Sequence, residues 1–200
     1  IMPSLVGSEM CIRDRYEDVV TVTSIEEKNN YNKGKKRFLD EAQVMARFNK
    51  NEGIVKILDF FEANNTAYIV MEYLEGITLK QYLGKYGVIQ FRNLIEMMLP
   101  LREALIEIHS QGLIHRDISP DNIMVQHNGK LKLMDFGAAR DYTESGNKSL
   151  TVILKPGYAP PEQYQTHGVQ GPWTDIYALC ATIYTVSYTH LRAHETRHDL

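Results

Sequence analysis

Apolar residues recur at helical spacing in three stretches of the chain. The first stretch predicts a helix over about residues 32–48, with Met45 on its apolar side. The second predicts a longer helix over about residues 94–108, and Pro100 inside it is expected to kink or split that helix. The third predicts a helix over about residues 173–185. These three helices account for most of the expected core.

Shorter apolar runs predict strands between the helices. Residues 54–62 and 67–72 read as a strand pair, with an Asn-Asn turn at 64–65. A further short strand is expected over residues 21–25. Thr78 can accept hydrogen bonds at the start of a short helix that follows the second strand of the pair. The chain is therefore expected to mix helices with small antiparallel sheets.

A hairpin is predicted over residues 122–134. Asn128-Gly129, between its two strands, is a strong hairpin signal. The hairpin would bring its first residue, Asn122, close to Asp135, which follows its last strand. Two oxygen-bearing side chains would then meet at one place in the fold.

The residues around this hairpin have the chemistry that phosphoryl transfer requires. Such a reaction needs a carboxylate to orient the attacking hydroxyl and oxygen ligands to hold Mg²⁺. Asp117, in His115-Arg116-Asp117, fits the first role, while Asn122 and Asp135 fit the second. The alternative for Asp117 is a loop aspartate that caps a turn, and His115 is expected to be a packed structural histidine.

The motifs resemble those of the protein kinase family, in its bacterial serine/threonine branch. Pro160-Pro161-Glu162 stands where that family has Ala-Pro-Glu, and Asp175 stands where a carboxylate holds the catalytic-loop backbone. The resemblance covers roughly residues 16–185. It implies an α+β, two-lobed protein kinase-like fold that is truncated at both ends, with a partial small lobe over residues 16–72 and a partial large lobe over 73–185.

The resemblance further implies a substrate and a nucleotide site. The parent enzyme would transfer the γ-phosphoryl group of ATP to a Ser/Thr hydroxyl of a protein, with Mg²⁺ as the metal. Asp117 would be the catalytic base, and Asn122 and Asp135 would hold the metal. The other nucleotide-binding residues that the resemblance implies are the ion-pairing Glu41, the adenine edge Met71, Glu72, Tyr73 and Leu74, and Met124 beneath the ring.

Two positions depart from the family pattern together. Ser119 stands where many serine/threonine kinases have a lysine that touches the transferred phosphate, and Lys155 stands where they have a threonine. We hypothesise an exchange in which Lys155 supplies the missing cation, because a positive charge there stabilises the transition state whichever segment carries it. The alternative is that Lys155 contacts only substrate or solvent.

Other family elements are missing from the sequence. No G-x-G-x-x-G loop occurs, and no lysine in a strand pattern is present to pair with Glu41. We therefore expect this chain by itself to be inactive and unstable, although the parent would be a protein serine/threonine kinase. The alternatives are a pseudokinase or ATP-binding scaffold module and, less favoured, a small-molecule phosphotransferase.

The two ends of the chain show a complementarity at the level of the genetic code. Residue i and residue 200 minus i have codons that can be reverse complements for every pair from Ile1 with Asp199 to Asp14 with Val186. Such a run is expected of one inverted DNA element, such as an adapter on either side of an insert. Residues 1–15 and 186–200 are therefore interpreted as non-native terminal segments.

Composition narrows the remaining classes of protein. The formal net charge is −3, which argues against a dedicated nucleic-acid partner. No apolar run approaches the roughly 20 residues that a membrane-spanning helix needs. With Cys11 in the terminal segment, Cys180 is left without a disulfide partner and is expected to be a small buried hydrophobe. These features agree with a cytoplasmic protein.

Overall fold

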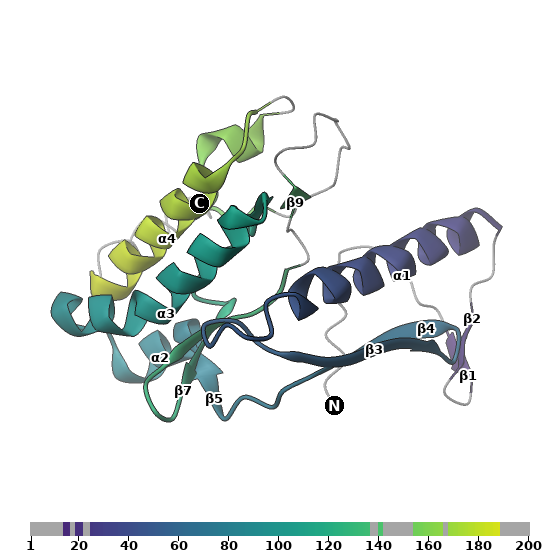
Figure 1. Ribbon diagram of the computed structural model, residues 1–200, viewed down its shortest axis with the longest axis horizontal. Coiled ribbons are helices and arrows are strands. Elements are labelled where there is room, and N and C mark those ends of the chain that lie inside the picture. Colours follow the sequence, from purple (N-terminus) through teal and green to yellow (C-terminus); the bar gives the residue numbers. More distant parts are fainter. Residues whose placement is uncertain are drawn as a thin grey trace, which may run out of the picture. The chain divides into compact units, whose positions relative to one another are not determined.

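The computed structural model describes residues 14–16, 19–21, 25–136, 140–141, 154–165 and 168–188. The chain forms two compact units (Figure 1). The first consists of Ile1–Lys50 and Lys56–Glu72, and the second of Asn51–Val55 and Tyr73–Leu200. Most of the two segments interpreted as non-native lies outside the described residues.

The first unit combines one long helix with two strand pairs. Helix α1 (Ile25–Ala46) packs against the antiparallel strands β3 (Ile57–Ala63) and β4 (Thr66–Met71), and β1 (Asp14–Tyr16) pairs with β2 (Val19–Thr21). The predicted turn between β3 and β4 is confirmed, because Asn64 and Asn65 have φ angles of 51° and 58°. Such positive values are tolerated best by asparagine and glycine.

Two boundaries predicted for this unit are wrong. Helix α1 begins at Ile25, although its first residues are polar and gave no apolar periodicity. Of the strand expected over residues 21–25, Thr21 belongs to β2, and residues 22–24 lie outside the described residues. The strand expected from residue 54 begins at Ile57, because Ile54 belongs to the second unit and forms an isolated bridge there with Leu133.

The second unit contains a three-stranded sheet that carries the predicted hairpin. Its strand order is β5 (Gly76–Thr78), β7 (Ile123–Gln126) and β8 (Leu131–Leu133), all antiparallel neighbours. The hairpin predicted around Asn128-Gly129 is confirmed, and Gly129 at its turn has a φ angle of 78°. A second, two-stranded sheet pairs β6 (Leu113–Ile114) with β9 (Arg140–Asp141).

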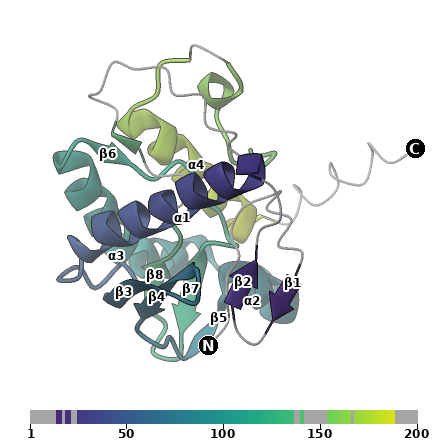
Figure 2. The ribbon, with the colours of Figure 1, turned by 90° about the vertical axis from the view of Figure 1, so that its right-hand side faces the viewer.

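Helices cover this sheet and supply most of its core. Thr78 caps α2 (Leu79–Tyr86) by accepting a hydrogen bond from the Gln81 amide at 3.1 Å. Helix α3 (Phe91–Ser110) continues through Pro100, so the proline does not split it. It packs against β8 and lies beside α4 (Pro172–Ser187), as Figure 1 and Figure 2 show. The buried apolar residues of α3 and α4 are Leu94, Met98, Leu101, Ala104, Leu105, Ile108, Ala178, Leu179 and Val186.

The other side of α4 is apolar and exposed. Cys180 lies on it, so the expectation that this cysteine is buried is wrong. Large exposed side chains at helical spacing share that side, namely Trp173, Ile176, Tyr177 and Tyr184. The apolar pattern predicted the helix correctly. Because both sides of α4 are apolar, the pattern did not determine which side is buried against the described residues.

None of the helices that the structure describes combines the length and the apolar character that a bilayer crossing requires.

Candidate active site

The β7–β8 hairpin brings Asn122 close to Asp135. Ile123 pairs with Leu133, and one step beyond this pair the Met134 amide donates to the Asn122 carbonyl oxygen at 2.9 Å. Asp135 follows immediately, with a φ angle of 62° that turns the chain out of the strand. The two side chains predicted to bind a metal are thus placed at one end of the hairpin by main-chain hydrogen bonds.

Asn122 holds Asp117 through a single amide group. Its Nδ2 donates to the Asp117 carbonyl oxygen at 2.9 Å and to Asp117 Oδ2 at 2.8 Å. Asn122 is buried, whereas the Asp117 side chain is 23% exposed. This arrangement fixes the carboxylate while leaving part of it accessible, and it leaves Asn122 Oδ1 available as an oxygen ligand.

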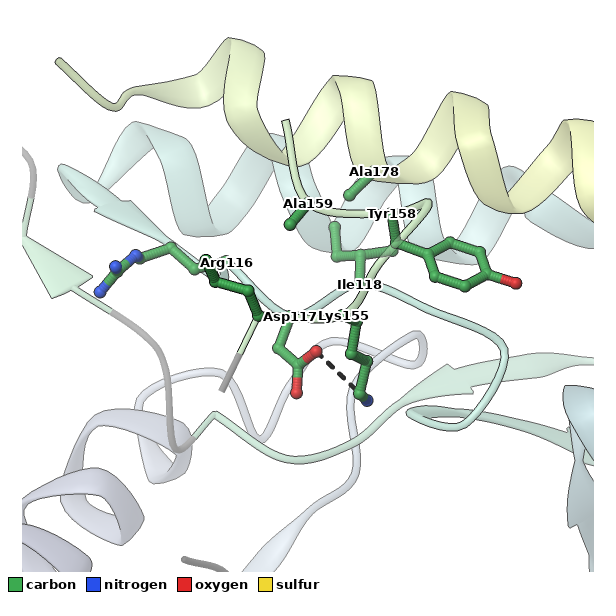
Figure 3. Close-up of a pocket in the computed structure, with 8 residues that line it drawn as sticks. Arg116, Asp117, Ile118, Lys155, Tyr158, Ala159 and Ala178 are labelled. Atoms are coloured by element: carbon green, nitrogen blue, oxygen red, sulfur yellow. Dashed lines mark ion pairs between the residues drawn. The ribbon is translucent and has the colours of Figure 1, made fainter. Parts of the chain in front are cut away.

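Lys155 contacts Ser119, the other position that departs from the kinase pattern, and the proposed base Asp117. Its Nζ lies 3.2 Å from Asp117 Oδ1, as Figure 3 shows. The same Nζ lies 3.0 Å from Ser119 Oγ. Ser119 is fully buried, so its hydroxyl provides a fixed acceptor for the ammonium group. The structure therefore brings together the four residues Asp117, Ser119, Asn122 and Lys155.

A small pocket lies beside this cluster. Helix α4 contributes Ala178 to it, while residues 116–118 and 154–159 contribute the rest (Figure 3). Its lining residues are Arg116, Asp117, Ile118, Leu154, Lys155, Tyr158, Ala159 and Ala178.

A buried carboxylate on α4 holds the backbone before Asp117. Asp175 Oδ2 accepts from the His115 amide at 2.8 Å, and Oδ1 accepts from the Arg116 amide at 2.8 Å. Oδ2 also contacts His109 Nε2 at 2.8 Å. Asp175 has no exposed surface, so these hydrogen bonds replace the hydration that its charge would otherwise need.

The backbone at Arg116 adopts an unfavourable conformation. Its φ angle of 70° lies in the left-handed region, which costs a non-glycine residue roughly 1–2 kcal/mol. The Arg116 amide is held by Asp175, and the Arg116 carbonyl oxygen accepts from Gln163 Nε2 at 3.0 Å. Buried hydrogen bonds on both sides of the residue can offset that cost.

His115 is buried and packs as a structural residue. Its ring lies edge-on to Phe136, with centroids 4.7 Å apart. Nδ1 accepts from the Asp117 amide at 3.3 Å, so the remaining proton lies on Nε2, which is 3.3 Å from the Met134 carbonyl oxygen. Burial lowers the pKa of His115 below its ordinary value, although the nearby carboxylates of Asp175, Asp117 and Asp135 act in the opposite direction. The geometry and the lowered pKa together describe a neutral imidazole.

The chain matches the protein kinase domain family over residues 7–199. It belongs to the protein kinase family. PknB of Mycolicibacterium smegmatis, a serine/threonine-protein kinase, is 38% identical over an alignment of 157 residues that covers 75% of this chain and 25% of PknB. PrkC of Bacillus subtilis, also a serine/threonine-protein kinase, is 35% identical over 151 residues, which are 75% of this chain and 23% of PrkC.

A solved structure agrees with this kinase assignment. The apo form of PpkA-294 superposes with a TM-score of 0.73 at 35% identity, covering 92% of this chain and 66% of that one. The protein kinase-like fold expected from the sequence is therefore confirmed. The chain spans only about a quarter of the length of the curated relatives named above.

The other predicted nucleotide-binding residues of this kinase are distributed over both units. Glu41 lies on α1, and Met71 and Glu72 stand at the end of β4, all in the first unit. Glu72 Oε1 accepts from the Lys56 amide at 2.9 Å. In the second unit, Tyr73 is 88% exposed, whereas Leu74 and Met124 are half-buried. The nucleotide-binding role of these six residues stays a prediction.

Gln163 was not among the site residues predicted from the sequence of this kinase. Gln163 is the third residue of the short 3₁₀ helix Pro161–Tyr164 and is separated from Arg116 by 47 positions. The preceding residue, Glu162, accepts from Thr174 Oγ at 2.9 Å. Both contacts are long-range, and no local sequence pattern indicates them.

Proposed function

We propose that this chain carries the catalytic centre of a serine/threonine protein kinase, which transfers the γ-phosphoryl group of ATP to a protein hydroxyl. One observation carries the proposal: the Asp117 carboxylate is held between the Asn122 amide and the Lys155 ammonium group, beside the hairpin that ends in Asp135. The bacterial serine/threonine kinases among its relatives support the choice of substrate class.

Asp117 is the proposed base. One of its oxygens, Oδ2, accepts from Asn122, so the carboxylate has a fixed orientation and still presents free lone pairs to an incoming hydroxyl. The acceptor hydroxyl would donate its hydrogen bond to this carboxylate and transfer its proton there as the new phosphate ester bond forms. Orientation of the nucleophile is the main contribution expected of this residue.

Lys155 is the proposed source of positive charge at the transferred group. Its Nζ is held by Ser119 Oγ at 3.0 Å and by Asp117 Oδ1 at 3.2 Å, so the ammonium group is positioned before substrate binds. A cation fixed at this position stabilises negative charge on the phosphoryl oxygens in the transition state. This contact with Ser119 is what the proposed exchange between the two positions requires.

Asn122 and Asp135 are the proposed Mg²⁺ ligands. Mg²⁺ prefers oxygen ligands and is usually bound by one or two protein carboxylates together with substrate phosphates. The free Asn122 Oδ1 and the Asp135 carboxylate fit that donor set, because the Asn122 nitrogen is already committed to Asp117. When bound, the metal would neutralise phosphate charge and leave positioning to the residues of the chain.

A paired substitution tests the proposed base in the full-length gene product that carries this chain. Asp117→Asn should lower kcat by at least about 100-fold, because it removes the proton acceptor. Asp121→Asn is the matched control, since Asp121 lies in the same loop and pairs with the exposed Lys80 at 3.1 Å. The readout is transfer of labelled phosphate from Mg-ATP to a protein substrate.

The same assay separates the competing functions. ATP binding without transfer to any acceptor would identify a pseudokinase or scaffold and contradict the proposal. Transfer to small hydroxyl compounds but not to protein would identify a small-molecule phosphotransferase. Equal activity of Asp117→Asn and Asp121→Asn would remove Asp117 from the catalytic role.

A further inference from the structure

We propose that Gln163 is a positioning residue that orients the peptide group between Arg116 and Asp117 and thereby aims the Asp117 carboxylate. The inference rests on the proposed function, because the effect of Gln163 on turnover matters only if Asp117 is the base. Its structural part, the restraint on one peptide group, can be measured without turnover.

The restraint acts on a single rigid plane. The Arg116 carbonyl and the Asp117 amide belong to the same peptide group, which is planar. Gln163 Nε2 donates to the carbonyl oxygen at 3.0 Å, and the amide donates to His115 Nδ1 at 3.3 Å. The plane is therefore held at both edges, and the Gln163 bond is the shorter of the two. Rotation of this plane would swing the Asp117 side chain away from Asn122.

The backbone conformation of Arg116, the residue before Asp117, requires such a restraint. Arg116 has a φ angle of 70°, which a non-glycine residue leaves readily unless its neighbours prevent it. Asp175 holds the Arg116 amide on one side and Gln163 holds the Arg116 carbonyl on the other. Together they fix both dihedral angles of the residue that precedes the catalytic aspartate.

Gln163 and Asp175 are both anchored at the first turn of α4. Asp175 lies in that turn, directly after Thr174, whose Oγ donates to Glu162 at 2.9 Å. Glu162 precedes Gln163 in the 3₁₀ helix, and the Gln163 amide closes that helix by donating to the Pro160 carbonyl oxygen at 3.0 Å. Gln163 and Asp175 therefore act from one fixed base rather than from independent segments.

The buried state of Gln163 indicates that its donor group is what matters. The residue is 8% exposed, and its Oε1 has no hydrogen-bond partner among the residues that the structure describes. Leaving a buried acceptor unsatisfied is unfavourable, and an apolar residue of the same length would avoid it. Such local conflicts are expected where a residue serves the active site rather than stability.

Substitution in the full-length gene product separates positioning from stability. Gln163→Leu removes the unsatisfied acceptor but leaves the Arg116 carbonyl oxygen without its donor. These two effects on stability oppose each other, so the melting temperature should change little. The kcat value should nevertheless fall by about tenfold or more, with the KM for ATP unchanged, because small displacements of a reacting group are costly. A parallel loss of stability and activity would indicate a merely structural role and overturn the proposal.

A second variant tests the donor itself. Gln163→Glu loses the donor while its carboxyl group is charged and regains one when that group is protonated. Burial at this position should raise the pKa of the introduced carboxyl group. The kcat of this variant relative to the unsubstituted enzyme should therefore rise as the pH is lowered from 8 to 6. Gln165→Glu is the matched control, because it makes the same change at an exposed side chain two residues away, and its relative kcat should stay flat. A flat profile for Gln163→Glu as well would contradict the donor role.

Amide hydrogen exchange tests the restraint without any turnover. In Gln163→Leu, the Asp117 amide should exchange about tenfold faster, while the amides of α3 should keep their protection. Unchanged exchange at Asp117 would overturn the inference whatever the activity. If the unsubstituted enzyme transfers no phosphate, the proposed function fails, and the exchange result still decides whether Gln163 restrains the peptide.

Discussion

The two compact units of this kinase hold their charged groups in different ways. In the second unit, Asp175 is fully buried and accepts two main-chain hydrogen bonds at 2.8 Å from His115 and Arg116. In the first unit, Lys35 and Glu62 form an ion pair at 2.7 Å, but the Glu62 side chain is 53% exposed. Water and salt screen the exposed pair, whereas the buried carboxylate has no alternative partner. The comparison indicates that the buried Asp175 carboxylate fixes the position of the neighbouring backbone in the second unit, whereas the exposed ion pair in the first unit does not.

The largest effect is expected from removing the buried carboxylate. Asp175→Ala leaves two buried main-chain donors without an acceptor and should lower the free energy of unfolding of the second unit by about 4 kcal/mol. Urea unfolding followed by the fluorescence of Trp173 measures this unit, because Trp173 lies on α4 and is the only tryptophan. The matched control is Glu62→Ala in the first unit, which should cost less than about 1 kcal/mol when measured by amide hydrogen exchange of β3 and β4. Equal losses from the two substitutions would refute the contrast.

An intermediate effect is expected from removing two hydrogen bonds between the Asn49 side chain and the Ile57 backbone in the first unit. Asn49 imitates a neighbouring strand, because its Nδ2 donates to the Ile57 carbonyl oxygen at 2.7 Å and its Oδ1 accepts from the Ile57 amide at 2.8 Å. Asn49→Ala should cost about 2 kcal/mol, measured by amide hydrogen exchange of β3 and β4. Asn30→Ala, at an exposed position of α1, should leave this exchange unchanged. A loss as large as that of Asp175→Ala would mean that the first unit is as tightly specified as the second.

The smallest effect is expected from the protonation of one buried histidine. Because the pKa of His115 is lowered in the folded protein, the unfolded chain binds a proton that the folded protein excludes. The stability of the second unit should therefore fall as the pH drops below about 6.5, the ordinary pKa of histidine, until the lowered value is reached. His115→Phe should remove this slope, and the exposed His127→Gln should keep it. A slope that persists in His115→Phe would assign it to another group.

Local sequence signals were sufficient for the elements of this kinase that depend on near neighbours. The Asn128-Gly129 turn and the Thr78 cap were predicted because their backbone angles and hydrogen bonds involve adjacent residues. The start of α1 was missed, since its first residues are polar and carry no periodicity. The burial of Cys180 was predicted wrongly, because burial depends on what covers α4 and not on the pattern of α4 itself.

The residues of the candidate site also differ in how far they could be predicted, depending on whether their contacts are local in the sequence. Asp117, Asn122 and Asp135 could be proposed from their spacing, because the hairpin between them is local. The contact between Lys155 and Ser119 could be anticipated only from two departures from the family pattern occurring together. Gln163 could not be anticipated at all, because its contact with Arg116 joins residues 47 positions apart and has no sequence signature.

The central claim is that Lys155 supplies the positive charge that Ser119 does not. The most direct measurement is the rate of phosphoryl transfer in single turnovers of the full-length gene product, with Mg-ATP saturating. Lys155→Met should lower this rate by roughly 100-fold or more. Adding Ser119→Lys to Lys155→Met should restore a substantial part of it, since the ammonium group then returns from the other side of the 3.0 Å contact. An unchanged rate in Lys155→Met would contradict the account.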